Sequence, residues 1–421
     1  MRFEFFIASR YLRAKRRQAV ISVITSISII GVAAGVASLI VALAINNGFR
    51  QDLQERLLGS TAHINLMRVE NDGIRDWRSL LDRLSKEPHV KAAAPALFEQ
   101  VLISRGARAR GAILKGVLPD YEKKVSELLQ TVKFGSATEL DPASSNSQIT
   151  NYKLPISQMP PIILGQDMAD ELGATVGSVV LVTSPQGELT PFGLVPKYVR
   201  FRVAGIFKSG FYDSDTGWSF IRLADAQQLF GLGDVISVIE FKVDDIYRAG
   251  AIGKQIEREA GRGFMATNWM EQNRQLFHAL KLERIVTFIT IGLIVMVAAL
   301  NILISLIMMV MEKTRDIAVL MSLGTRKAQV RNVFIFQGVL IGVVGTAIGL
   351  ALGYVLSWIG GHYRLVSLSP EVYSIDYVPF AARAMDGVVV AVVALAVSFV
   401  ATIYPSWSAS RILPAEALRY E

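Results

Sequence analysis

The chain has 421 residues, of which 52% are hydrophobic and 19% are charged, and it contains no cysteine. Without cysteine it has no disulfides, so any folded domain depends on its core alone. The formal net charge of +8 gathers in two short segments, whereas the long polar part of the chain is nearly neutral, which excludes a nucleic-acid-binding surface.

Four apolar stretches lack any formal charge over about 24 residues or more, and about 20 residues suffice to cross a bilayer as a helix. One stretch lies near the N-terminus and the others lie in the last third of the chain. They predict transmembrane helices over residues 20–48, 283–311, 332–361 and 387–410. The first stretch is longer than the apolar core of a signal peptide, so we expect it to be retained rather than cleaved.

Basic residues indicate which segments face the cytoplasm. The first 17 residues hold six arginines and lysines against one glutamate, and residues 312–331 hold five against two acidic residues. By the positive-inside bias, the cytoplasmic segments are residues 1–19, 312–331 and 411–421, and the segments on the opposite side are 49–282 and 362–386.

Residues 49–282 are long enough to form a domain, and their short alternating patterns are typical of a mixed α+β fold. We expect strands over 63–69, 99–104, 110–117, 161–164, 178–184, 199–207, 218–221 and 235–243, with helices over 77–86, 167–172, 224–230 and 247–260. Residues 48–58 and 269–282 continue the helical periodicity of the neighbouring spans, which predicts two helical stalks. Residues 134–160 are polar and aperiodic, so we expect a loop there.

A second irregular stretch, residues 184–197, combines three prolines and two glycines with apolar side chains that a simple surface loop does not require. Strands over 178–183 and 198–207 flank it, which predicts a protruding hairpin with an apolar tip. Exposed apolar tips often mark partner sites. The alternative is that the tip packs against its own domain.

No pattern for catalysis, metal binding or nucleotide binding occurs. The sequence has no phosphate loop of the form G-x-x-x-x-G-K-[ST], no G-x-S-x-G elbow, and four scattered histidines without metal-ligand spacing. The uncharged stretches of the predicted spans (20–48, 285–311, 332–361 and 387–410) contain no Asp, Glu, Lys or Arg, which argues against an ion relay. We therefore expect no catalytic residue, no metal and no cofactor in this chain, which is predicted not to be an enzyme.

Small residues recur at helical spacing in two predicted spans, and such rows let helices approach closely. They are Gly338, Gly342, Gly345, Gly349 and Gly353 in the third span, and Gly31, Gly35, Ser38 and Ala42 in the first. Two interpretations remain open at this point, packing within the chain and a seam between two copies.

The basic loop between the second and third spans is the sharpest local signal. Residues 312–323 have an amphipathic helical pattern, and Gly324 is placed to end that helix. A short helix across the cytoplasmic face predicts a docking site for a soluble partner. The residues that we expect to form this site are Glu312, Lys313, Arg315, Asp316, Ile317, Leu320 and Gly324.

Several runs resemble one family over essentially the whole chain. They are EKTRDIAVLMSLGTRKAQVRNVFIFQGVLIGVVGTAIGLALG (residues 312–353), the N-terminal run through residue 49, GIFKSGFYD (residues 205–213) and the hairpin at residues 189–197. They resemble the permease subunits of lipoprotein-releasing ABC transporters, within the wider class of macrolide-exporter and cell-division permeases. The resemblance implies four transmembrane helices, one plus three, with a large α+β periplasmic domain between the first two.

The resemblance also implies partners. Such permeases pair with a second copy or a paralogue and with two copies of a cytoplasmic ABC ATPase, which binds ATP and Mg and docks on the loop that holds Gly324. They take an acylated lipoprotein from the outer leaflet of the inner membrane of a Gram-negative bacterium and pass it to a periplasmic chaperone. The hairpin residues implied to bind that chaperone are Leu189, Thr190, Pro191, Phe192, Gly193, Leu194, Val195 and Pro196.

The lipid anchor is implied to enter a cleft lined by the first two spans. Our candidates for its lining are Val41, Leu43, Ile45 and Phe49 on the first span and Ile291, Ile294, Val295 and Leu303 on the second. Two other functions stay open, a mechanotransmission permease of a tripartite efflux pump and a signalling permease that controls a cell-wall hydrolase. The choice between a homodimer and a heterodimer of permeases also stays open.

Overall fold

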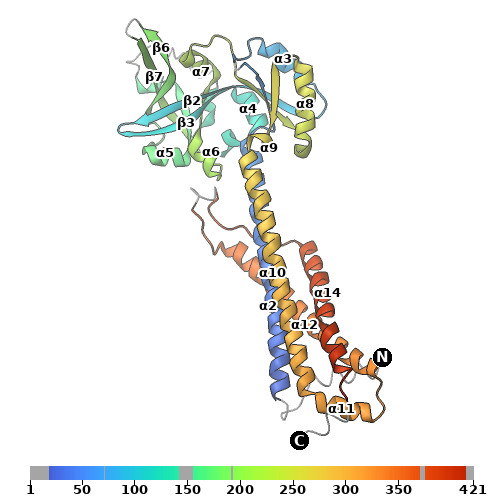
Figure 1. Ribbon diagram of the computed structural model, residues 1–421. Coiled ribbons are helices and arrows are strands. Elements are labelled where there is room, and N and C mark those ends of the chain that lie inside the picture. The colour runs from blue at the N-terminus through green and yellow to red at the C-terminus, as the bar shows by residue number, and fades with distance from the viewer. Residues whose placement is uncertain (1–18, 71, 142–154, 191–192, 370–374, 414–421) are drawn as a thin grey trace. The chain divides into compact units, whose positions relative to one another are not determined.

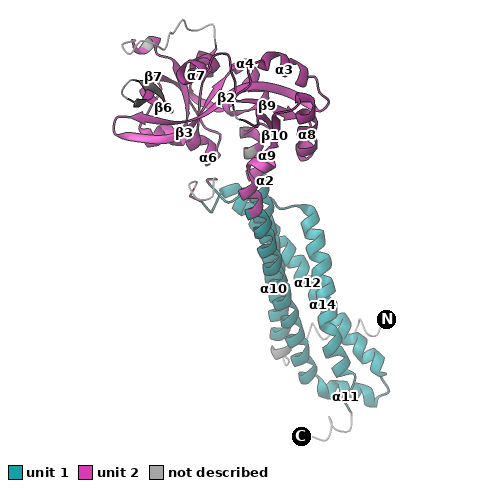
Figure 2. Ribbon diagram, turned by 45° about the horizontal axis from the view of Figure 1, so that its top comes forward, with its two compact units in different colours: residues 1–51, 279–367, 377–421 teal, residues 52–278, 368–376 magenta. Residues whose placement is uncertain are grey.

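A computed structural model describes residues 19–70, 72–141, 155–190, 193–369 and 375–413. The chain divides into two compact units, which Figure 2 shows in different colours. We name residues 1–51, 279–367 and 377–421 the helical unit, and residues 52–278 and 368–376 the sheet unit. Each unit is described by itself.

The long helices of the chain are α2 (Ala19–Ser60), α10 (Arg274–Glu312), α12 (Lys327–Tyr363) and α14 (Ala384–Ala409). All four are long and apolar enough to cross a membrane. The short helix α11 (Thr314–Ser322) connects α10 to α12. The predicted arrangement of one N-terminal and three C-terminal apolar helices is confirmed.

Glycines of α12 allow neighbouring helices of the same chain to approach closely. A Cβ atom on Gly349 would lie 2.6 Å from the carbonyl oxygen of Ala33 on α2, and one on Gly342 would lie 2.5 Å from Ser398 Oγ on α14. Gly345 and Gly353 also face α2, and Gly338 faces α14. The row of small residues on α12 is therefore used for packing within the chain, which decides between the two interpretations of its spacing.

The strands of the sheet unit form one ten-stranded sheet. They are β1 (Ile64–Arg68), β2 (Val90–Arg105), β3 (Arg108–Val117), β4 (Val132–Gly135), β5 (Pro161–Gly165), β6 (Val179–Thr190), β7 (Gly193–Phe207), β8 (Trp218–Arg222), β9 (Val238–Val243) and β10 (Phe264–Asn268). Their order is β10-β1-β9-β2-β3-β8-β5-β7-β4, and β6 pairs with both β2 and β7.

Strand β2 connects two parts of this sheet. One edge of β2 pairs with β3 from Ala96 to Arg105, and the other edge pairs first with β9 and then, over Leu102–Ser104, with β6. The pairings β2–β3–β8–β5–β7–β6–β2 therefore close a ring, from which β9, β1 and β10 extend. Figure 1 shows the β6–β7 hairpin at one end of this unit and α3 (Trp77–Leu84) with α8 (Ala249–Ala260) at the other.

The remaining helices of the sheet unit are short. They are α4 (Pro119–Val125), α5 (Gln166–Leu172), α6 (Tyr212–Gly217), α7 (Leu223–Phe230) and α9 (Trp269–Gln272). The core holds a buried charged cluster in which Lys115 Nζ lies 2.6 Å from Glu122 Oε1 and 2.8 Å from Glu240 Oε2. Burial raises the pKa of Glu240 to about 7, and the attraction of Lys115 opposes that rise.

Three local expectations differ from the structure. The helix expected over 269–282 is interrupted at Asn273, which separates α9 from α10 and whose side-chain amide donates to the carbonyl of Trp269. The hairpin strands are longer than predicted, because β6 and β7 stay paired as far as Thr190 and Gly193. Within the expected loop 134–160, residues 142–154 lie outside the described residues, and a 3-10 helix covers Ala137–Leu140. Strands β4 and β10 and helices α4 and α6 were not expected from the sequence.

Candidate functional site

The β6–β7 hairpin is the first candidate surface. Its register runs from Val179 opposite Arg202 to Thr190 opposite Gly193, with an irregularity between Ser184 and Glu188. There residues 185–187 of β6 face Pro196 of β7, because Ser184 pairs with Lys197 and Glu188 with Val195. Pro185 and Pro196 lack an N–H, so the ladder cannot continue through them. Of the predicted hairpin residues, Pro191 and Phe192 lie outside the described residues.

The loop around α11 is the second candidate surface. Lys313 is buried and donates to Asp316 Oδ2 at 2.7 Å, and Ile317 lies in a core cluster with Val310 and Phe334. Gly324 has a φ of +98°, a left-handed conformation that suits glycine and ends α11. Leu320 is half-buried. The predicted residues thus divide into those that hold the loop in place and those that remain accessible, which are Glu312, Arg315, Asp316 and Gly324.

Two apolar side chains of this loop were missed by the sequence reasoning. Leu323 is 79% exposed and Val319 is 43% exposed. Val319 lies on α11 and Leu323 directly follows it, whereas Ile317 and Ala318 are buried. The amphipathic pattern of residues 312–323 therefore did include the apolar residues that stay exposed. An exposed apolar pair beside Arg315 offers a partner both contact area and charge.

The third candidate surface lies between α2 and α10. A mostly apolar cavity of about 420 Å³ is lined by Ile24, Ile27, Val297, Leu300, Asn301, Ile304, Ser305 and Met308. It opens on the same pair of helices that the sequence predicts, but none of the eight predicted lining residues is part of it. Leu43, Ile291, Ile294 and Val295 pack against the core of the helical unit, and Val41, Ile45, Phe49 and Leu303 are half-buried.

Close contact between α2 and α10 beside this cavity depends on Gly31. A Cβ atom there would lie 2.1 Å from Asn301 Nδ2, so a larger residue at this position would require the amide of Asn301 to move. The hydrogen bond that Asn301 makes is with Ser305 of its own helix, at 3.5 Å. One wall of the cavity therefore presents a polar amide among apolar side chains.

Two neighbouring asparagines of α2 connect it to other helices near the opposite end of the unit. Asn46 Nδ2 donates to a carboxylate oxygen of Glu283 on α10, which also accepts from Thr287 at 3.2 Å. Asn47 Nδ2 donates to Asp386 Oδ2 on α14 at 2.6 Å. The sequence reasoning missed these contacts, because the Asn-Asn pair forms no motif and its partners lie far along the chain.

Comparison with known proteins decides the family. The FtsX-like permease C-terminal family matches residues 288–414, and the MacB-like periplasmic core domain matches residues 25–259. The lipoprotein-releasing system transmembrane protein LolC of Xylella fastidiosa is 36% identical over 99% of this chain and 98% of its own length. The chain belongs to the lipoprotein-releasing system transmembrane protein family.

Other members of this family are also similar along their whole length. LolC of Neisseria meningitidis is 37% identical over 99% of both chains, and LolE of Haemophilus influenzae is 29% identical over 99% of both. Among solved structures, the periplasmic region of MacB from Actinobacillus actinomycetemcomitans aligns with a TM-score of 0.32 at 16% identity, covering 52% of this chain and 94% of that one.

Family membership places the candidate surfaces in a membrane protein of the permease type. The matched periplasmic core domain lies between the N-terminal apolar helix and the three C-terminal ones. Permeases of this family are subunits that do not themselves carry out catalysis.

Proposed function

We propose that this chain is a permease subunit of an ATP-driven lipoprotein-releasing ABC transporter in the inner membrane of a Gram-negative bacterium. The observation that carries the proposal is the full-length similarity to lipoprotein-releasing relatives. The acyl anchor is proposed to pack against α2 and α10 at the predicted positions, which include Val41, Leu43, Ile291 and Ile294. Burial of an acyl chain is non-directional and contributes about 0.8 kcal/mol per CH₂ group, so apolar side chains supply that burial without selecting one anchor. The cavity at Ile24 and Met308 lies nearer the proposed cytoplasmic ends of the same helices and is not part of this proposal.

The proposal includes an orientation and a source of energy. Both termini and the α11 loop face the cytoplasm, and residues 49–282 and 362–386 face the periplasm. Two copies of an ABC ATPase bind ATP and Mg and dock on α11, where Leu323, Val319 and Arg315 are accessible. A second permease, either another copy or a paralogue, completes the transporter.

Docking on α11 has a direct test. Leu323→Asp removes an exposed apolar side chain and adds a charge, so association with the ATPase should weaken by at least about tenfold. Ser322→Asp is the matched control, because it adds the same charge at the neighbouring position, the last residue of α11, without removing apolar surface. Co-purification of the ATPase from membranes measures both variants. Equal association of the two variants would contradict the role of α11.

The β6–β7 hairpin is proposed to receive the periplasmic chaperone. The paired part of the hairpin extends well beyond the β2–β6 contact, which ends at Thr183, so its outer half does not add to the ring of strands. A projecting pair of strands that stays paired as far as Thr190 and Gly193 is a suitable shape for insertion into a partner. Photo-crosslinking from Phe192 should capture a small soluble chaperone.

Cargo capture tests the function itself. A photo-reactive residue at Val41, one of the predicted lining residues of the first span, should crosslink to an acylated lipoprotein in membranes that contain the complete transporter. Val393 is the matched control, because it is an exposed apolar residue on α14. Equal capture at Val41 and Val393 would contradict a specific cleft. Capture of an efflux adaptor or a cell-wall hydrolase at Phe192 would instead favour one of the two alternative functions.

A further inference from the structure

Helix α2 continues into the sheet unit without a break. The boundary between the two units falls between residues 51 and 52, and α2 ends only at Ser60. The other long helix that leads into this unit, α10, is separated from the short helix α9 at Asn273. A continuous helix keeps its main-chain hydrogen bonds, so a shift or rotation at one end is passed on more fully than across an interruption. The last turns of α2 are therefore the stiffer of the two connections.

Arg56, in the last turns of α2, contacts the turn that follows strand β7. Its Nη1 donates to the main-chain oxygen of Gly210, and its Nε donates to Asp52 Oδ2 of its own helix at 2.8 Å. Asp52 thus orients the guanidinium toward the turn. The side chain of Arg56 is 19% exposed, so this charge-assisted hydrogen bond is largely shielded from water and is stronger than one between neutral groups.

A buried carboxylate holds the turn that Arg56 contacts. Asp215 is 1% exposed, and its Oδ1 accepts from both the N–H and the hydroxyl of Ser209 at 2.8 Å. Its Oδ2 accepts from the N–H of Gly210 at 3.0 Å. Gly210 has a φ of +78°, which suits glycine, and a Cβ atom there would collide with the guanidinium of Arg56. The main chain that Arg56 contacts is therefore fixed in position by groups of the sheet unit.

The same turn directly continues a strand of the β6–β7 hairpin. Strand β7 ends at Phe207, immediately before the turn, and begins at Gly193, which pairs with Thr190 at the outer end of the hairpin. Its outer part is paired with β6 and its inner part with β5, so it is held along its length by main-chain hydrogen bonds. One stretch of paired main chain thus leads from the Arg56 contact to the outer end of the hairpin.

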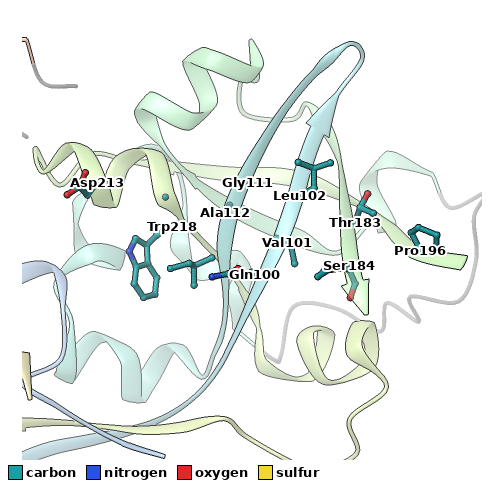
Figure 3. Close-up of a pocket in the computed structure, with 13 residues that line it drawn as sticks. Gln100, Val101, Leu102, Gly111, Ala112, Thr183, Ser184, Pro196, Asp213 and Trp218 are labelled. Atoms are coloured by element: carbon teal, nitrogen blue, oxygen red, sulfur yellow. The ribbon is translucent and has the colours of Figure 1, made fainter. Parts of the chain in front are cut away.

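A hollow beside the turn leaves the base of the hairpin room to move. Its volume is about 750 Å³, and its lining includes Asp213 and Trp218 as well as Pro185 and Pro196 of the hairpin. Figure 3 shows Asp213 and Pro196 at opposite ends of this hollow. Asp213 belongs to α6, which follows the turn. Since side chains do not fill this space, a displacement of the turn reaches the hairpin through the main chain of β7.

We propose that Arg56 is a positioning residue that couples α2 to the β6–β7 hairpin. Movement of α2 in the ATP cycle displaces the turn at residues 208–211 and, through β7, the hairpin. This inference rests on the proposed function, in which the ATPase acts on the cytoplasmic side and the chaperone binds the hairpin. Arg56 lies in neither of these docking surfaces, so its loss should affect the link between ATP hydrolysis and release rather than hydrolysis itself.

The number of lipopeptide molecules released per ATP hydrolysed tests the proposal. The assay uses the complete transporter in proteoliposomes, a fluorescent triacylated lipopeptide as the probe and the chaperone in the buffer. Arg56→Met should leave hydrolysis without lipopeptide unchanged and lower this ratio by at least about fivefold, the lower end of typical coupling between sites. Arg56→Lys keeps a cation that can donate to the Gly210 carbonyl, so it should recover part of the loss. A role in folding alone would reduce the amount of active transporter but not the ratio.

Gln54→Leu is the matched control. Gln54 Nε2 donates to the hydroxyl of Tyr247 at 2.7 Å, so this variant also removes one hydrogen bond between the end of α2 and the rest of the sheet unit. Tyr247 lies in the 3-10 helix Ile246–Arg248, which follows β9 rather than a strand of the hairpin. Release per ATP should therefore stay unchanged. Equal losses in Arg56→Met and Gln54→Leu would overturn the proposal, because any loosened contact of α2 would then have the same effect.

A variant of the turn provides an independent test. Ser209→Ala removes the hydroxyl that donates to Asp215 and accepts from the N–H of Phe211 at 3.1 Å, and it leaves Arg56 in place. It should lower release per ATP in the same direction as Arg56→Met. Hydrogen-exchange protection of β9, which lies outside the ring of strands, should stay unchanged and so show that the sheet unit is folded. An unchanged ratio in Ser209→Ala would contradict the role of the turn.

The wild-type transporter separates the two hypotheses. If the wild type releases lipopeptide and Arg56→Met releases as much per ATP, the coupling role is wrong while the transport function stands. If the wild type releases none, the proposed function fails together with the inference that rests on it.

Discussion

Replacement of Glu240 by glutamine should change how the stability of the sheet unit depends on pH. Glu240 and Glu122 share Lys115 in a site where all three side chains are at most 4% exposed. Burial in the low-dielectric core disfavours the charged form of Glu240, and the neighbouring carboxylate of Glu122 adds to this effect, so protonation of Glu240 is favoured there. A glutamine side chain at this position would keep the shape and remove the charge.

The magnitude follows from the pKa of Glu240, which burial raises from 4.5 to about 7. Because the folded state binds the proton more tightly than the unfolded state, the wild-type sheet unit loses stability as pH rises from about 4.5 to about 7. A pKa shift of this size corresponds to about 3 kcal/mol. Glu240→Gln removes this dependence, so the variant should match the wild type near pH 5 and be more stable than it above pH 7.

Hydrogen exchange read by mass spectrometry on β3 and β9 measures this difference in the purified full chain between pH 5 and pH 8. The difference in protection between Glu240→Gln and wild type should grow with pH and level off above about pH 7. Lys115→Met is a useful comparison, because it leaves two buried carboxylates without a cation and should destabilise the unit by about 3–5 kcal/mol. A difference between Glu240→Gln and wild type that stays constant with pH would refute this account of the buried cluster.

Three further predictions concern the helical unit, each measured by thermal unfolding of the detergent-purified protein. Gly349→Val places side-chain atoms against the backbone of α2 and should lower the free energy of unfolding by about 1–3 kcal/mol. Gly292→Val should lower it much less, because nothing lies within 4 Å of a Cβ atom there, and equal effects of the two variants would contradict the packing account. Gln337→Leu should stabilise the unit by about 1–2 kcal/mol, because neither amide atom of this fully buried side chain has a hydrogen-bond partner among the described residues. A loss of stability would contradict this and would reveal a partner of the Gln337 amide. Asn46→Leu should destabilise by about 1–3 kcal/mol, because Glu283 loses a hydrogen-bond donor, and Glu283→Gln in the same background should recover part of that loss.

The sequence predicted the α11 loop more completely than it predicted the cleft between the first two spans. The amphipathic pattern of residues 312–323 was sufficient to predict α11, because helical periodicity is a local property. The same pattern could not show that Ile317 is covered by Val310 and Phe334, which belong to neighbouring helices. The cleft between the first two spans stays a prediction that the resemblance implies, and the cavity between α2 and α10 contains none of its eight predicted residues.

The sequence by itself determined the membrane layout, the family and the alternating character of the sheet unit. These depend on quantities summed along the chain, namely the length of uncharged segments and hydrophobic periodicity. Only the tertiary structure decided that the glycines of α12 are used within the chain and that β2 pairs with β9 and then with β6 along one edge. Both depend on contacts between segments that are distant in sequence, which no local pattern encodes.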